Sequence, residues 1–193
     1  MSTSAKPRLR SLCARMLVHF RSDAEGVVAI EFALVAMPFL MLVAAIFECC
    51  LVCLGQLTLD TAMDRATRAV FTGSFQEASD GTDPGERMRK DLCVSFVMFN
   101  CADLKVEVTT AASFAQSGAR DPYDPEGKGL AKDFGSRFDC PGGNDIVTVR
   151  VATTVSRFFP FLDLTHRPVG HDRQLIMSTA VFKAEPYANG RCR

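Results

Sequence analysis

One apolar stretch dominates the pattern of hydrophobic and polar positions along this chain. It covers residues 27–54, and its charged side chains are Glu31 near the start and Glu48 near the end. About 20 helical residues cross the hydrocarbon core of a bilayer, and a helix of this length would reach roughly 42 Å. The pattern therefore predicts a transmembrane helix whose outer end stands clear of the lipid.

The residues that follow keep a helical period but become amphipathic. In residues 55–73 charged side chains fall between apolar ones that recur every three or four positions. These apolar positions are Leu59, Ala62, Met63, Ala66, Ala69 and Val70. Since no proline interrupts residues 39–75, we expect one long helix that ends near Gly73. Its apolar stripe needs a partner surface, and the sheet predicted downstream can supply it.

A second, shorter helix is predicted after a turn at residues 76–85. Residues 85–99 have a helical pattern, and Glu86 suits the first turn. Asp83 can cap this helix, and Pro84 fits its first turn.

Three later segments have the pattern of β-strands, because polar and apolar residues alternate or β-branched residues are frequent. They are residues 103–110, 144–158 and 173–184. The segment between the first two is rich in Gly, Pro, Asp and Ser and reads as a long loop, residues 111–143. The last two strands should pair antiparallel. The expected fold is α+β: a long N-terminal helix packed on a small antiparallel sheet, with a short second helix.

The distribution of charge predicts the orientation in the membrane. The whole chain has a formal net charge of zero, but residues 1–25 carry five basic and two acidic side chains. Basic residues before an apolar run mark the cytoplasmic side. We expect a cytoplasmic leader (1–26), a transmembrane helix (27–54) and an extracytoplasmic domain (55–193). Nothing in that domain predicts the basic face that a nucleic-acid partner requires.

Two other export signals fit the apolar stretch less well. A secretory signal could be cut after Val43-Ala44-Ala45, but the apolar run begins too early and continues beyond this point. A lipoprotein signal needs a small residue directly before its cysteine, whereas Cys49 follows Glu48 and Cys53 follows Val52.

Glu31 is the residue in this stretch that most needs an explanation, because an ionised carboxylate is costly in hydrocarbon. From the residues alone, two interpretations remain open. A nearby amine could neutralise the carboxylate, which would offset the cost of burying both charges. Alternatively, Glu31 lies at the lipid headgroups and is favoured there by the helix dipole.

Residues 24–75 resemble the TadE-like minor pseudopilins of tight-adherence (Tad/Flp) pili. The residues that carry the resemblance are Gly26, Glu31-Phe32, Pro38, Glu48 and Arg68. The segment Lys183-Ala184-Glu185-Pro186-Tyr187 is also similar to the family. The cysteine-rich stretch 49–53 departs from its pattern.

The resemblance implies a structural role in pilus assembly and secretion. A prepilin peptidase would cut after Gly26, and Gly26, Val27, Glu31 and Phe32 would form the processing site. The mature chain would remain in the bacterial inner membrane with its domain in the periplasm, and Pro38 would kink the helix. The implied partners are other Tad pseudopilins, the inner-membrane platform, the membrane lipid and, as a further candidate, the major pilin.

Four cysteines lie in the outward domain, where an oxidising compartment favours disulfides. Three pairings of Cys93, Cys101, Cys140 and Cys192 are possible, and proximity favours Cys93–Cys101 with Cys140–Cys192. The cluster Cys49-Cys50-x-x-Cys53 is interpreted as small apolar residues, with a disulfide between packed helices as the alternative.

Other chemistry finds weak support in the sequence. His166, His171 and Asp172 could bind zinc only with a third ligand such as Asp163. The acidic loop residues Asp121, Asp124, Glu126 and Asp133 do not have the spacing of an EF-hand. There is no G-x-S-x-G turn and no phosphate-binding loop. We therefore expect no cofactor and no enzymatic activity. An uncleaved membrane-anchored binding or sensing module is the main rival interpretation, and an anchored periplasmic enzyme is a second.

Overall fold

The computed structural model describes most of the chain after the basic leader. The described residues are 24–94, 100–117, 121–127, 129–162, 167–187 and 192. The chain divides into two units, Met1–Ile46 and Phe47–Arg193, and each is described by itself.

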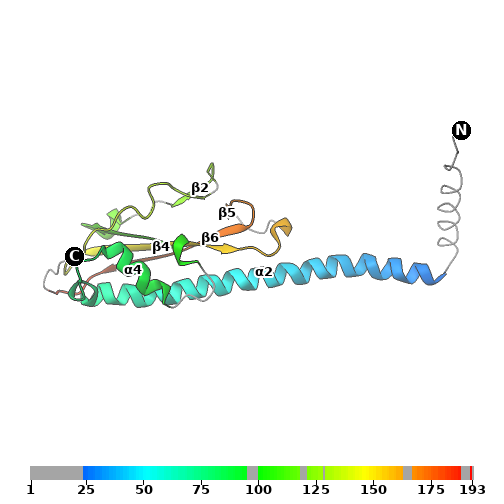
Figure 1. Cartoon of the computed structure of the whole chain (residues 1–193), viewed down its shortest axis with the longest axis horizontal. Helices are drawn as coiled ribbons and strands as arrows, with labels where there is room; N and C mark the ends of the chain where they lie inside the picture. Colours follow the sequence, from blue (N-terminus) through cyan, green and yellow to red (C-terminus); the bar gives the residue numbers. More distant parts are fainter. Residues whose placement is uncertain are drawn as a thin grey trace, which may run out of the picture. The chain divides into compact units, whose positions relative to one another are not determined.

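A single helix, α2 (Ala24–Thr72), runs through 49 residues (Figure 1). The prediction of one long helix ending near Gly73 is confirmed. Gly73 ends α2 because its backbone has a φ of 83°, a left-handed conformation that glycine adopts at little cost. A short helix, α3 (Ser74–Glu77), follows directly.

The second predicted helix is present but shorter than expected. Helix α4 covers Pro84–Cys93, and residues 95–99 of the prediction lie outside the described part of the chain. The Asp83 side chain accepts a hydrogen bond from the Glu86 backbone N–H at 3.0 Å, as predicted for a cap.

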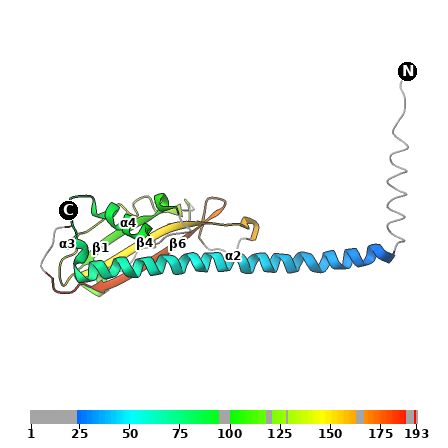
Figure 2. The same ribbon diagram turned by 60° about the horizontal axis from the view of Figure 1, so that its bottom comes forward.

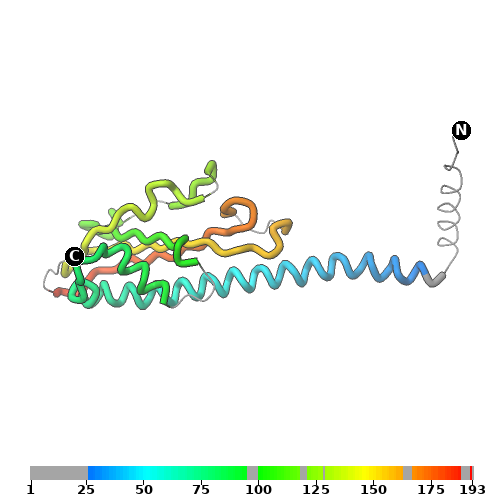
Figure 3. Tube along the Cα trace, viewed as in Figure 1, coloured from blue at the N-terminus to red at the C-terminus, as the bar shows by residue number. Residues whose placement is uncertain are grey.

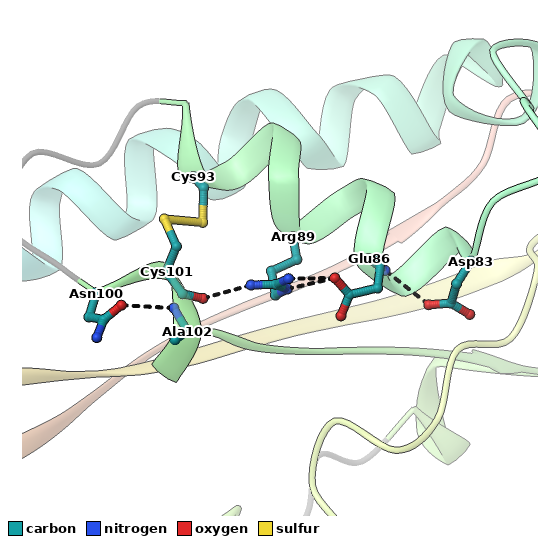
Figure 4. A network of polar contacts seen from close by, with 7 residues as sticks. All are labelled: Asp83, Glu86, Arg89, Cys93, Asn100, Cys101 and Ala102. Carbon is teal, nitrogen blue, oxygen red and sulfur yellow. Dashed lines mark hydrogen bonds and ion pairs between the residues drawn. A yellow bond between two sulfur atoms is a disulfide. The ribbon is translucent and has the colours of Figure 1, made fainter.

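A disulfide and one arginine fix the end of α4 to the chain that follows. Cys93 pairs with Cys101, which lies in the short helix η1 (Cys101–Asp103). Arg89 donates a hydrogen bond to the Cys101 carbonyl at 3.0 Å and pairs with Glu86 on its own helix (Figure 4). Helix α4 is therefore held at both ends, by its cap and by this cross-link.

The sheet of the domain is antiparallel, as predicted. Its strands are β1 (Lys105–Ala111), β4 (Ile146–Ser156), β6 (Arg173–Lys183) and the short β5 (Pro168–Val169), in the order β1-β4-β6-β5. The central strand β4 pairs with β6 along its whole length, with Ile146 opposite Lys183 and Ser156 opposite Arg173 (Figure 3). All three predicted strands are confirmed, with ends that differ by at most two residues.

One face of the sheet packs on the outer part of α2 and on α4 (Figure 2). Successive side chains of β4 alternate between the faces, so Val147, Val149 and Val151 point to the same side. They are fully buried in one core with Leu59 and Met63 of α2. The amphipathic stripe predicted for residues 55–73 has this sheet as its partner.

The predicted loop 111–143 covers the other face of the sheet. It contains a short helix η2 (Phe114–Gln116) and a two-stranded ribbon of β2 (Tyr123–Asp124) and β3 (Gly129–Leu130). Phe134 of this loop packs with Ala152 and Leu175 in a smaller core. The loop is therefore a structural layer, which its polar composition did not predict.

The C-terminal segment holds the outer end of α2. Glu185 donates its backbone N–H to the Phe71 carbonyl at 3.0 Å. The Tyr187 hydroxyl accepts a hydrogen bond from the buried Gln76 side chain at 2.8 Å. Burial, together with the charge of Asp145, raises the pKa of the Tyr187 hydroxyl, so it stays protonated near neutral pH. A second disulfide joins Cys140, which precedes β4, to Cys192 near the C-terminus.

Replacing Gly73 by alanine should destabilise the domain more than the same change at Gly81. Both glycines have a φ of 83°, but a Cβ on Gly73 would lie 2.7 Å from Cγ of Tyr187, whereas nothing lies within 4 Å of one on Gly81. Gly81→Ala should cost about 1 kcal/mol for the left-handed backbone. Gly73→Ala should cost about 1–3 kcal/mol more, because the ring must move.

Urea unfolding of the full chain in detergent, followed by circular dichroism, measures both free energies. Equal losses for Gly73→Ala and Gly81→Ala would show that Tyr187 does not pack tightly against the end of α2.

Candidate functional site

The first part of α2 exposes its apolar side chains. Phe32, Leu34 and Val35 are each at least 70% exposed. The helix is long and apolar enough to cross a membrane, and none of the described residues buries its most apolar stretch. It fits a single-pass membrane anchor, because such a surface is unfavourable in water and favourable in lipid.

The residues of the predicted processing site lie at the start of α2. Val27, Glu31 and Phe32 are exposed, and Gly26 is half-buried. Val27 and Glu31 are four positions apart in the helix, so their side chains share one face. Glu31 makes no ion pair or side-chain hydrogen bond with the described residues, so its charge is available to a partner. Cleavage after Gly26 stays a prediction.

Pro38 lies inside α2, and the helix continues on both sides of it. A proline removes one backbone hydrogen bond and is tolerated in membrane helices where neighbouring groups compensate. The kink predicted at this position stays a prediction.

Glu48 differs from every other charged residue in the apolar part of α2, because it is buried. Only 2% of its surface is exposed, whereas its neighbours Cys49 and Cys50 are exposed. It is the first member of the stripe that faces the sheet, followed at helical spacing by Gly55 and Leu59. A carboxylate therefore occupies a position that apolar or small residues occupy farther along the helix.

The Glu48 carboxylate contacts the segment directly after β4. One oxygen, Oε2, accepts hydrogen bonds from the backbone N–H groups of Phe158 at 3.0 Å and Phe159 at 3.3 Å. The other, Oε1, lies 3.7 Å from Nε of Arg157. Both charged side chains are at least 96% buried. The backbone N–H of Arg157 in turn donates to the Asp172 carbonyl at 2.7 Å, which continues the contact toward β6.

This arrangement fixes the position of the helix relative to the end of the sheet. Oε1 and the Arg157 Nε and Nη2 atoms make no hydrogen bond with described residues, so attraction between the charges and the two backbone bonds together offset the burial. Removing either partner would leave the other charge buried and uncompensated.

Sequence reasoning placed Glu48 near the outer membrane face but missed its contact with Arg157. One signal was present in the sequence. Glu48 lies in phase with the stripe that continues through residues 55–70, so the stripe itself predicts burial of the carboxylate. A buried carboxylate requires a cation or several N–H donors, and Arg157 lies near the end of the predicted strand 144–158.

The other candidate residues are not brought together into one site. Cys49, Cys50 and Cys53 are exposed and unpaired, while the four domain cysteines form the two disulfides that proximity favoured. His171 is exposed, and His166 and Asp163 lie outside the described residues. Within the described part of the chain, no group of three or more His, Cys, Asp or Glu could hold a metal ion.

Two of the acidic loop residues stabilise turns. Asp121 accepts a hydrogen bond from the Tyr123 backbone at 3.0 Å, and Asp124 accepts one from the Glu126 backbone at 3.0 Å. Such local bonds are typical of Asp in turns.

A surface hollow of about 380 Å³ lies between α4 and β1. Asp83, Glu86, Arg89 and Lys105 line it. The hydrogen bond from Arg89 lowers the pKa of the Glu86 carboxyl, although partial desolvation acts in the opposite direction. Because Asp83 caps α4 and Arg89 bonds to the Cys101 carbonyl, these charges already stabilise the fold.

Comparison with known proteins finds a match to a family model in the N-terminal part of the chain. The family model described as TadE-like protein matches residues 26–68. The matched segment contains the predicted processing site, Pro38 and Glu48. No curated protein and no solved structure matches the chain significantly. The resemblance to TadE-like proteins is therefore confirmed over this segment.

Glu48→Gln should destabilise the domain by about 3 kcal/mol, because the amide can still accept the two backbone hydrogen bonds but leaves the Arg157 charge buried without a counter-ion. The double variant Glu48→Leu with Arg157→Leu should lose less than the sum of the two single variants. Chemical unfolding of the full chain in detergent measures these free energies.

Glu31→Gln is the matched control, since it removes an exposed carboxylate from the same helix and should leave the unfolding free energy unchanged within about 0.5 kcal/mol. Strict additivity of the Glu48 and Arg157 variants would contradict the pairing.

Proposed function

We propose that this chain, whose residues 26–68 match TadE-like proteins, is a minor pseudopilin-like structural component of a Tad/Flp pilus assembly and secretion system. It is inserted in the bacterial inner membrane with its N-terminus in the cytoplasm and its disulfide-bonded domain in the periplasm. A prepilin peptidase cuts it after Gly26. The observation that carries the proposal is the exposed apolar helix α2, whose first turns contain Gly26 and the Glu31-Phe32 pair.

Trimming after Gly26 gives the helix a new charged end. The freed amine of Val27 is a cation at the edge of an apolar surface, and Glu31 is an anion one helical turn farther along. In an assembly of such helices, the amine of one subunit can neutralise Glu31 of its neighbour, which offsets the cost of removing both charges from water. Because the pairing works only at one relative height of the two helices, it sets their register.

A different face of α2, roughly opposite the face that carries Val27 and Glu31, supplies further attraction between subunits. In lipid, helices associate through close packing rather than through the hydrophobic effect, so small side chains at the contact are favourable. Ala29, Ala33 and Ala36 lie three or four positions apart and share one face of α2. We therefore propose that this face contacts other Tad pseudopilins or the major pilin. The inner-membrane platform and the peptidase are the remaining proposed partners.

The outward domain has a supporting role in this proposal and is not an enzyme. Its charged hollow beside α4 is built from residues that cap a helix and bond a backbone carbonyl. An uncleaved membrane-anchored binding or sensing module would use the same domain and would tolerate the loss of Glu31, which gives the two functions different experimental outcomes.

Mass spectrometry of the N-terminus, from cells with and without a prepilin peptidase, tests the processing step. The expected mature chain begins at Val27, and only when the peptidase is present. A full-length chain, or a chain that begins at Ile46, in both kinds of cell would overturn the proposal.

Glu31→Gln tests the proposed charge pair separately. Loss of a pair worth more than about 1.4 kcal/mol should lower the yield of assembled complexes or pili about tenfold or more. Asp64→Asn is the control, because it removes an exposed carboxylate from the part of α2 beyond the apolar stretch. Unchanged maturation, pili and complexes in Glu31→Gln would favour the uncleaved anchor.

A further inference from the structure

The segment that follows β4 exposes several aromatic rings. Residues 157–162, which we call the aromatic loop, read RFFPFL and end in the short helix η3 (Pro160–Leu162). Phe158 and Phe161 are 65% and 67% exposed. The rings of Phe159 and Phe161 contact each other edge to face, with their centroids 5.9 Å apart. Two exposed phenylalanines on one short loop form an apolar surface that favours burial.

Contacts to α2 hold this loop in place. Its backbone at Phe158 and Phe159 donates to the buried Glu48 carboxylate. The Phe158 ring packs edge to face on Phe47, with the centroids 6.5 Å apart. Both ribbon views show the loop beside α2, where it follows β4 (Figure 1; Figure 2). The loop could leave the helix only by exposing Glu48 and Arg157.

The level of residues 47–48 coincides with the end of the hydrocarbon core. About 20 helical residues cross that core, so a span that begins at Val27 is complete near Ile46. The aromatic loop is therefore held at the depth of the headgroups and the upper acyl chains. Apolar side chains that project at this depth bury themselves in the interface.

We propose that the aromatic loop inserts into the leaflet that the domain faces and forms a second contact with the same bilayer that α2 crosses. The inference rests on the proposed membrane insertion of α2. With α2 as its only attachment, the domain could tilt together with α2 relative to the membrane. With Phe158 and Phe161 in the lipid, the end of β4 that leads into the aromatic loop is fixed toward the membrane. The opposite end of β4 points away from the membrane.

The chain contains no tryptophan, so a single introduced tryptophan reports its own depth. Three full-length variants are incorporated into nanodiscs at one chain per disc: Phe161→Trp in the loop, Phe39→Trp in the span and Phe114→Trp in η2. Phe114 is 58% exposed and follows Ala111, which pairs with Ile146 at the end of β4 away from the loop. Since β4 has 11 residues and each strand residue advances about 3.3 Å, the two ends of β4 lie roughly 33 Å apart. Phe114 is the matched control, because it is exposed like Phe161 but lies near the end of β4 away from the loop.

Tryptophan fluorescence is then compared in plain phosphatidylcholine and in lipids brominated either near the headgroup end or near the methyl end of the acyl chains. Phe161→Trp should be quenched about twofold or more by the shallow bromines and less by the deep ones, as expected for an interfacial side chain. Phe39→Trp should be quenched more by the deep bromines, and Phe114→Trp by neither.

Quenching of Phe39→Trp without quenching of Phe161→Trp would overturn the inference and leave the membrane anchor intact. No quenching of Phe39→Trp would overturn the membrane anchor, on which the proposed function depends. Emission of Phe161→Trp that shifts to the blue only when several chains share a disc would assign the aromatic loop to a neighbouring protein and also overturn the inference. Phe158→Trp repeats the measurement if Phe161→Trp fails to form its disulfides.

Discussion

One continuous helix has to satisfy two different environments, and the rest of the structure follows from this constraint. The first part of α2 is not covered by the described residues and presents apolar side chains all round. The second part presents a narrow apolar stripe to the sheet and polar side chains elsewhere. The change of environment begins where the first residue of the stripe becomes buried. Glu48 lies at this change and contacts the end of β4.

The two ends of the stripe are fixed by different physical means. At the end nearer the start of the chain, a buried ion pair and two backbone hydrogen bonds connect Glu48 to the residues after β4. At the other end, the Tyr187 ring packs against the backbone of Gly73, and Gln76 bonds to its hydroxyl. Between them, interdigitating aliphatic side chains supply attraction without a preferred position along the helix. The polar contacts at the two ends therefore set the position of α2 along the sheet. The apolar side chains between them supply most of the attraction between helix and sheet.

Much of this fold could be predicted from the sequence because its signals are local. The helix period, the Asp83 cap and the alternation in β4 depend on neighbours within a few residues. The layer formed by residues 111–143 was read as a loop, since its few apolar residues, such as Phe134, are too sparse to show a period. The pairing of Glu48 with Arg157 joins residues more than one hundred positions apart. Neither residue identity nor spacing specifies that contact until the sheet places Arg157 beside the helix.

The position of β4 in the sheet has a consequence for biogenesis. The stripe of α2, from Leu59 to Val70, emerges from the ribosome well before its main partners Val147, Val149 and Val151. At bacterial elongation speeds of about 20 residues per second, this interval lasts several seconds. During this interval, the apolar stripe lacks the strands that cover it in the folded domain. The stripe is therefore covered only after β4 and β6, the two longest strands of the sheet, have been synthesised.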